Sequence, residues 1–240
     1  FNKVVNTLAN VLEFYLMFAG ESQKAKGERQ KSDNILDRWI LAKLQVLVKE
    51  VSEGLENYKL AEASRPIEEF ITELSQWYVR RSRDRFKGDD EEDKQAALGT
   101  LREVLLALSK VMAPFTPFMA EKVWLAVSGE KESVHLEKWP EVDKKMRDEK
   151  IIEEMGLVRR VVESGLALRA KSGIKTRQPL EQLIVSDIKL SNECKKIIED
   201  ELNVGVVEII TGSIDQTDNM VVSEDTSLKT ALNIKITPEL

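Results

Sequence analysis

QWYVRRSRDRFKG, residues 76–88, is the stretch around which the rest of the chain is organised. Apolar residues upstream of it recur at spacings of three and four, which is typical of a helix with one buried face. At about 100° per residue, Arg81 and Arg85 fall on the same side as these apolar residues. The cations on the solvent side are Arg80, Arg83 and Lys87. One helix is therefore expected to bury two arginines and to expose three other cations.

The two arginines on the apolar side cannot be ordinary surface charges. An unpaired buried charge is very costly, so we expect carboxylates or backbone carbonyls to meet both Arg81 and Arg85. Together with Trp77 and Tyr78, they are assigned a structural or interface role. Core positions, rather than base-stacking ones, are expected for the tryptophans of the chain, Trp39, Trp77, Trp124 and Trp139.

The composition indicates a globular protein. The chain has 240 residues, 42% of them hydrophobic, which is enough for one large and one small domain. No apolar run approaches the roughly 18 residues that a membrane span needs, and residues 1–20 lack the features of a secretory signal. The single cysteine excludes an intramolecular disulfide framework. We expect a cytoplasmic protein without a membrane partner.

Charge is distributed unevenly along the chain, whose formal net charge is −6. Residues 181–240 hold 12 acidic and 5 basic side chains, whereas the first 180 residues are close to neutral. A protein that bound nucleic acid by bulk charge alone would be basic overall. Any such contact must therefore be local, and the acidic C-terminal part is expected to lie away from phosphates.

Helical periodicity predicts an antiparallel helix bundle over residues 1–130, with short turns between the helices. Ser32 is the expected N-cap of the second helix, and the third is expected to run to Phe86. The acidic run at 89–93 favours the start of the fourth helix. Thr116, followed by a proline, is the expected N-cap of the fifth.

Residues 131–172 are predicted to form a connector and a long helix. The apolar positions of that helix are Ile151, Met155, Val158, Val162 and Leu166. From residue 173 to 240, short β-rich runs surround one helix between Ser191 and Leu202, which is typical of a small α+β domain. The expected fold class is mainly α: an antiparallel helix bundle followed by a small α+β domain.

Residues suited to catalysis or to metal binding are scarce. A zinc site needs three or four ligands, but the chain has one histidine, His135, and one cysteine, Cys194. Cys194 shares a helical face with two isoleucines and is expected to be a buried thiol. No glycine-rich phosphate loop occurs. We expect no metal and no catalytic residue in this chain.

RAKSGIKTRQ, residues 169–178, is a second basic cluster, with four cations and no acidic residue. One interpretation is a solvated helix end, because cations near a helix C-terminus match the helix dipole. The other is a phosphate-facing patch, because Gly173 lets the backbone bend and the cluster lies at a junction between two domains. The candidates for phosphate contact are Lys171, Lys175 and Arg177.

Six motifs resemble, in the same order, the C-terminal part of isoleucyl-tRNA synthetases, so the resemblance covers essentially the whole chain. They are NTLANVLEF (6–14), SDNILDRWILAKL (32–44), LSQWYVRRSRDRF (74–86), MAPFTPFMAEKVW (112–124), SVHLEKWP (133–140) and ALRAKSGIKTRQPL (167–180). This resemblance implies the anticodon-binding bundle of a class I synthetase, with an isoleucine-accepting tRNA as its partner. The candidate tRNA contacts are then Arg80, Arg83, Lys87, Lys171, Lys175 and Arg177.

The signature catalytic motifs of that family, HIGH-like and KMSKS-like, do not occur in this sequence. The resemblance therefore implies that a catalytic domain elsewhere in the same parent chain binds ATP and Mg²⁺ and is a second partner. The chain itself is expected to hold no cofactor and to have no ligase activity alone.

Two alternatives remain open at this point. Valyl-tRNA synthetases share the bundle and a similar basic helix, although residues 133–140 and 173–180 favour the isoleucine family. Two positions depart from the family pattern, Pro66 and Lys87.

The second alternative, from a different class of function, is a helical protein-interaction scaffold. In it, a partner domain supplies the carboxylates for the two arginines on the apolar side.

Overall fold

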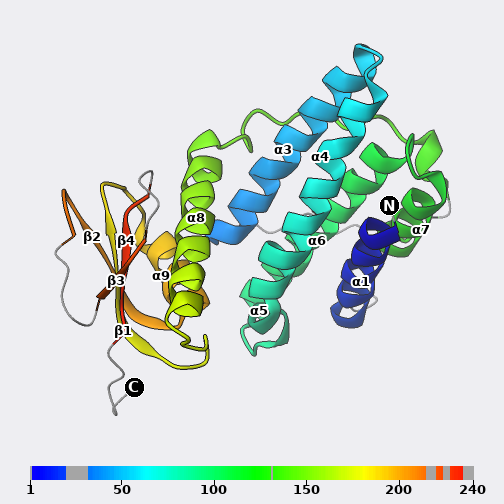
Figure 1. The fold of residues 1–240 in the computed structure, drawn as a ribbon. Coiled ribbons are helices and arrows are strands. Elements are labelled where there is room, and N and C mark those ends of the chain that lie inside the picture. The colour runs from blue at the N-terminus through cyan, green and yellow to red at the C-terminus, as the bar shows by residue number, and fades with distance from the viewer. Residues whose placement is uncertain (1, 20–31, 131, 215–219, 224–227, 235–240) are drawn as a thin grey trace. The chain divides into compact units, whose positions relative to one another are not determined.

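The structure, a computed structural model, describes residues 2–19, 32–130, 132–214, 220–223 and 228–234 (Figure 1). It divides into two compact units, residues 1–149, called here the helical unit, and residues 150–240, called the sheet unit. The first is built from helices, and the second combines helices with a four-stranded sheet. The expected fold class, mainly α with a small α+β part after the helices, is confirmed.

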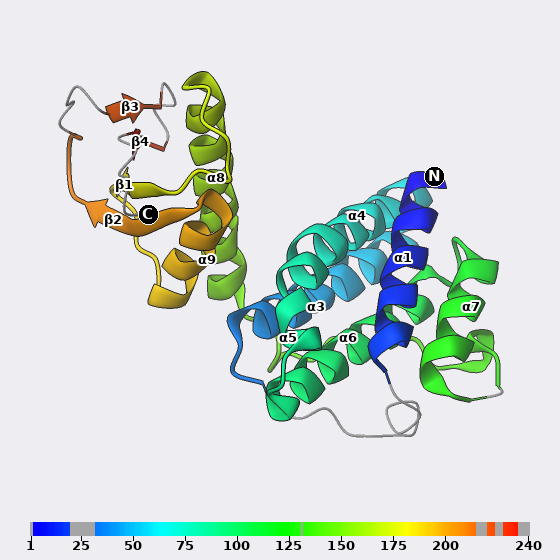
Figure 2. The same cartoon turned by 90° about the horizontal axis from the view of Figure 1, so that it is seen from below.

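The helical unit has one core shared by several helices. They are α1 (Asn2–Phe18), α3 (Ile35–Glu56), α4 (Leu60–Glu73), α5 (Arg83–Lys87), α6 (Glu91–Met112) and α7 (Pro117–Ser128). α3 and α4 form an antiparallel hairpin through a short turn, and α6 packs against both α3 and α7 (Figures 1 and 2). Side chains at helical spacing, such as Ile40, Leu44 and Leu105, are almost completely buried.

The N-cap of α3 is Asn34 and not Ser32, so that prediction was wrong. The Asn34 side chain accepts a hydrogen bond from the N–H of Leu36 at 2.9 Å. Ser and Asn are equally good caps, so spacing alone could not choose between them. Ser32 uses its hydroxyl differently: its Oγ accepts from the N–H of Asn34 and donates to Asp37.

The other predicted helix starts are found where the sequence indicated. Asp90 caps α6 by accepting from the N–H groups of Glu92 and Asp93, and the acidic first turn matches the positive end of the helix dipole. Thr116 occupies the N-cap position of α7 with Pro117 in the first turn. The Thr116 hydroxyl makes no cap bond, however, and donates to the carbonyl of Met112.

The third predicted helix is interrupted. After α4 the chain forms a π-helical segment, η1 (Leu74–Val79), and α5 begins only at Arg83. A π-helical turn takes up one extra residue. Each side chain that follows is therefore rotated from the position that it would have in a regular α-helix of the same sequence. The fully buried positions beyond the segment are Ser82 and Phe86, and Arg81 and Arg85 lie at the border of the buried face.

The sheet unit contains α8 (Glu149–Lys171), α9 (Asn192–Leu202) and four strands. These are β1 (Leu180–Ser186), β2 (Val204–Ile210), β3 (Met220–Val222) and β4 (Thr230–Asn233), in the order β2-β1-β4-β3. β1 and β2 are parallel and are joined through α9, whereas the other pairs are antiparallel. The last β-rich run of the sequence, Leu232–Ile236, predicts a strand whose first two residues lie in β4, and residues 235–236 lie outside the described part.

The connector before α8 contains a short 3-10 helix, η2 (Val134–Leu136). Trp139 in this connector is 37% exposed, so the core position expected for it was wrong. Its indole Nε1 donates to the Ser52 hydroxyl on α3 at 2.8 Å, which ties the connector to the helices. Trp39 and Trp124 are buried as expected, and Trp77 is half-buried.

Gly54 marks a close approach of α3 and α4, because a Cβ added there would lie 2.7 Å from the Cβ of Ala63. We expect Gly54→Ala to lower the free energy of unfolding by about 1–3 kcal/mol through overpacking. The matched control is Gly156→Ala in α8, where nothing lies within 4 Å of the new Cβ. It should raise stability by about 0.5–1 kcal/mol. Urea denaturation of both variants checks this, and a stabilising Gly54→Ala would contradict the close approach.

Candidate nucleic-acid interface

The exposed cations of residues 76–88 lie on one face. Arg80, Arg83 and Lys87 are all exposed, as the wheel predicted. Gln76 is exposed too, and the four positions are spaced by four, three and four residues. We call Gln76, Arg80, Arg83 and Lys87 the basic stripe. The guanidinium of Arg80 lies 6.0 Å from the ring centre of Trp77, and its Nε donates to the carbonyl of Gln76 at 2.7 Å.

Arg85 is held by two carboxylates, as its place on the apolar side required. Its Nη1 and Nη2 donate to the two oxygens of Asp37 at 2.8 and 2.9 Å. Nε and Nη2 donate to Asp93, the shortest of these contacts being 2.7 Å. Side-chain exposure is 12% for Arg85, 0% for Asp37 and 38% for Asp93. One carboxylate is thus fully buried and one faces solvent.

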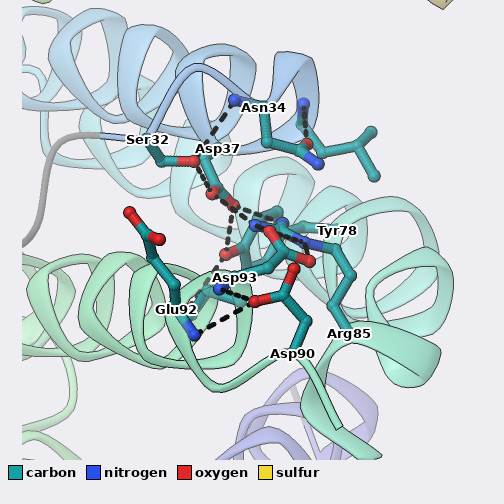
Figure 3. Close-up of polar contacts among 10 residues, drawn as sticks. Ser32, Asn34, Asp37, Tyr78, Arg85, Asp90, Glu92 and Asp93 are labelled. Atoms are coloured by element: carbon teal, nitrogen blue, oxygen red, sulfur yellow. Dashed lines mark hydrogen bonds and ion pairs between the residues drawn. The ribbon is translucent and has the colours of Figure 1, made fainter. Parts of the chain in front are cut away.

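The buried carboxylate of Asp37 accepts further hydrogen bonds. The Tyr78 hydroxyl donates to it at 2.7 Å, and the Ser32 hydroxyl also donates to it (Figure 3). We call Asp37, Tyr78, Arg85 and Asp93 the Asp37 network. Its members come from α3, η1, α5 and α6, so a single cluster joins four elements of the helical unit.

The electrostatics of the cluster keep Tyr78 and Arg85 in the protonation states that donate hydrogen bonds. Burial, and then the negative charge of Asp37, raise the pKa of Tyr78 well above its usual value, so the hydroxyl remains a donor. Burial by itself would lower the pKa of Arg85, but hydrogen bonds to Asp37 and Asp93 outweigh burial and raise that pKa. Arg85 therefore stays charged and serves structure, while the basic stripe keeps its charges in solvent.

Arg81 is half-buried, and it too takes part in an interaction. Neither Arg81 nor Arg85 extends fully into solvent. That Arg81 meets a carboxylate or a carbonyl stays a prediction.

The four cations of the second basic cluster differ in their exposure to solvent. Lys171, Lys175 and Arg177 are exposed, but Arg169 is only 1% exposed. The Arg169 guanidinium donates to backbone carbonyls rather than reaching a phosphate-accessible surface. Three of the four cations of this cluster therefore lie at the surface, and they are the three candidates for phosphate contact.

The burial of Arg169 follows from the face that α8 buries. The buried residues of α8 are Ile151, Met155, Val158, Val161, Val162, Gly165, Leu168 and Arg169, and within them the row Val158, Val162, Gly165 and Arg169 is spaced by four, three and four. The predicted apolar face continued instead to Leu166, which is 38% exposed. The true face runs through Gly165, where a Cβ would collide with the Leu202 side chain of α9. A glycine in a contact face carries no hydrophobic signal, so the pattern was lost there.

The described part of the chain offers no candidate metal site. No group of three or more His, Cys, Asp or Glu side chains there could hold a metal ion. Cys194 is buried, and burial raises the pKa of its thiol to about 12. His135 lies exposed on η2. Among the described helices, none has the length and apolar character to span a bilayer.

The Asp37 network predicts unequal effects of its two carboxylates on stability. Asp37→Asn leaves a buried guanidinium without its buried counter-charge and should lower the free energy of unfolding by about 3–5 kcal/mol. Asp93→Asn removes a partly exposed partner and should lower it by about 1 kcal/mol. Urea denaturation of the two variants measures both values. Equal losses would mean that burial does not distinguish the two ion pairs.

Comparison with known proteins agrees with this architecture. A family described as "Anticodon-binding domain of tRNA ligase" matches residues 37–185. A protein named isoleucine–tRNA ligase from Clostridium novyi is 42% identical over 214 residues, which cover 86% of this chain and 21% of that protein. A protein of the same name from Deinococcus radiodurans is 40% identical, covering 88% of this chain and 20% of its own length.

A third such protein, from Thermus thermophilus, is 42% identical and covers 85% of this chain and 21% of itself. Among solved structures, a ternary LeuRS-tRNA-LeuAMS complex of Agrobacterium radiobacter K84 aligns over 61% of this chain and 16% of that chain, with 22% identity and a TM-score of 0.42. The chain spans about a fifth of the length of the isoleucine–tRNA ligases it matches. Because the matched family covers more than half of the sequence, the chain belongs to the anticodon-binding domain family of tRNA ligases.

Proposed function

We propose that this chain is the tRNA-binding part of an isoleucine–tRNA ligase and that it holds the anticodon stem-loop of an isoleucine-accepting tRNA. A catalytic domain of the same parent protein, acting in the cytoplasm, would carry out the ligation with ATP and Mg²⁺. The names of the relatives favour isoleucine over valine. By itself the chain is expected to be inactive, because its sequence contains neither the HIGH-like nor the KMSKS-like motif of the family.

The observation that carries the proposal is the basic stripe, a local row of exposed cations on a chain whose net charge is negative. Lysine and arginine bind RNA phosphates through charge and release counterions as they do so. Long side chains normally lose conformational entropy when they bind a ligand. Here the backbone that carries them is already fixed by the Asp37 network, so only the side chains have to be ordered on binding.

We further propose that Lys171, Lys175 and Arg177 form a second contact with the same RNA. They are exposed and sit where α8 ends and the chain turns towards β1. The end of α8 is fixed by Gly173, whose φ of 69° closes the helix with hydrogen bonds from Gly173 to Ala170 and from Ile174 to Arg169. A fixed helix end presents its cations in one arrangement.

The scaffold alternative loses its main support. It required a partner domain to supply carboxylates for the arginines on the apolar side. Arg85 finds both of its carboxylates, Asp37 and Asp93, within the helical unit. The exposed cations face solvent, where an external ligand can reach them, and their charge fits a phosphate backbone.

Replacing the basic stripe tests the proposal directly. In the full-length protein, Arg80→Ala, Arg83→Ala and Lys87→Ala together should weaken tRNA binding on the order of 10- to 100-fold near physiological salt. The slope of log K against log salt should flatten by about 2–3 units, because up to three phosphate contacts are lost. Fluorescence titration of labelled tRNA at several salt concentrations measures both quantities.

The matched control removes the same charge elsewhere in the helical unit, at three lysines that are also exposed, Lys122, Lys138 and Lys144. Replacing these by alanine should leave the slope within about half a unit of the wild-type value. If the stripe variant and this control bind tRNA equally well, the stripe is not the interface.

The second contact has its own test in the full-length protein. Lys171→Ala, Lys175→Ala and Arg177→Ala together should flatten the salt slope by roughly 3 units, while circular dichroism and the unfolding temperature stay unchanged. A variant with the affinity and slope of the wild type would return this cluster to the solvated-helix-end interpretation.

A further inference from the structure

We propose that Arg169 is a positioning residue for RNA binding: from its buried place it fixes the turn at residues 175–178 and so holds Lys175 and Arg177 in position for a phosphate. This inference rests on the proposed contact between that turn and tRNA. It assigns a function to the one cation of the cluster that cannot reach the ligand itself.

The turn is closed on itself and then tied to Arg169. Its ends are joined by a hydrogen bond from the N–H of Gln178 to the carbonyl of Lys175 at 3.0 Å. The Gln178 side chain also accepts from the N–H of Lys175 at 3.1 Å. Nη1 of Arg169 donates to the carbonyls of both residues, at 3.1 and 3.0 Å. One nitrogen atom thus spans the two ends of the turn.

Asn203, at the junction of α9 and β2, completes the support. Its side-chain Nδ2 donates to the carbonyl of Thr176 at 3.0 Å. Its own carbonyl accepts from Nη2 of Arg169 and from the N–H of Leu180, each at 3.0 Å. Asn203 adopts a φ of 49°, a conformation that asparagine tolerates better than most residues. Arg169 therefore links the last turn of α8 to the turn at residues 175–178, called here the basic turn, and to the end of α9.

This arrangement sets the polarity of the turn. The buried guanidinium of Arg169 engages the carbonyls of Lys175 and Gln178, and Asn203 engages the carbonyl of Thr176 at an exposed position, while the side chains of Lys175 and Arg177 are exposed. At Lys175 and Gln178 the partial negative charge of the carbonyl is therefore directed towards the buried guanidinium and not towards the surface that carries the two cations. Such a surface attracts a phosphate more strongly than a turn whose carbonyls point outwards.

The hydrogen-bond partners of Arg169 also determine the net charge beneath the turn. Its described partners are neutral carbonyls, and no ion pair to a described carboxylate is found. Carbonyl dipoles solvate a guanidinium group but do not cancel its charge, unlike the carboxylates around Arg85. A net positive charge consequently lies directly beneath the basic turn. Lysine could not replace this arginine, because its single ammonium lacks the planar set of donors that reaches three carbonyls.

The test is a double-mutant cycle in the full-length protein, with isoleucine-accepting tRNA as the probe. Arg169→Lys keeps the charge but loses the fork of donors, and we expect it to weaken tRNA binding about 5- to 10-fold and to flatten the salt slope by about 1–2 units. In a protein that already carries Lys175→Ala and Arg177→Ala, the same Arg169→Lys should have no further effect on affinity or slope. Equal effects in both backgrounds, or none in either, would overturn the proposal.

A control separates positioning from loss of stability. Ile198→Val shortens a fully buried side chain of α9 and should lower the unfolding temperature of the protein. It leaves the turn and its partners intact, so tRNA affinity and salt slope should match the wild type. If Ile198→Val weakens tRNA binding as much as Arg169→Lys does, destabilisation alone explains the result and the proposal fails.

If Arg169→Lys does not fold, a second variant tests the same proposal. Asn203→Gly keeps the left-handed backbone but removes the hydrogen bond to the turn at Thr176. It should weaken tRNA binding in the same direction, and the effect should again vanish when Lys175 and Arg177 are already alanine. If the Lys175→Ala and Arg177→Ala pair by itself leaves binding unchanged, the proposed RNA contact fails, whereas an intact contact without coupling refutes only the role of Arg169.

Discussion

The buried ion pair between Asp37 and Arg85 is the interaction on which the helical unit depends. A carboxylate with no solvent exposure can persist only if charge and hydrogen bonds compensate it, and Arg85, Tyr78 and Ser32 supply both. Because the partners come from different elements, the pair can form only when α3, η1, α5 and α6 occupy their places together. The geometry that presents Arg80, Arg83 and Lys87 to solvent is therefore a consequence of where one carboxylate is buried.

Both basic clusters have a buried arginine beneath exposed cations, but the charge around the buried arginine differs between them. Each has a guanidinium inside and cations outside, and in each the inner arginine orders the backbone that carries the outer ones. Arg85 meets two carboxylates, Asp37 and Asp93, so the basic stripe rests on a cluster whose formal charge is negative rather than positive. Arg169 is solvated by carbonyls and keeps its charge. The first arrangement favours rigidity, and the second adds to the local positive potential.

Most of the fold followed from periodicity, because helices in a shared core need apolar residues at spacings of three and four. The same wheel placed Arg85 next to a counter-charge and left Lys87 exposed. It failed where the signal was absent or divided: Gly165 interrupts the apolar row that leads to Arg169, and two cap residues, Ser32 and Asn34, competed at the start of α3. The carboxylate partners of Arg85 lie 48 and 8 residues away in sequence, a distance over which no local pattern operates.

The π-helical segment at Leu74–Val79 has a consequence for the length of the chain at this point. Its extra residue rotates the helix so that Phe86 meets the rings of Phe14 and Phe18 and the two arginines lie at the edge of the buried face. If the segment formed a regular α-helix at its present length, the downstream side chains would turn by about 100°. Arg81 and Arg85 would then face the aromatic cluster, and Phe86 would turn away from it. The segment thus takes up one surplus residue between α4 and α5: deleting one residue from it would leave a regular α-helix with Phe86 still in the core, whereas straightening it without a deletion would exchange core for surface.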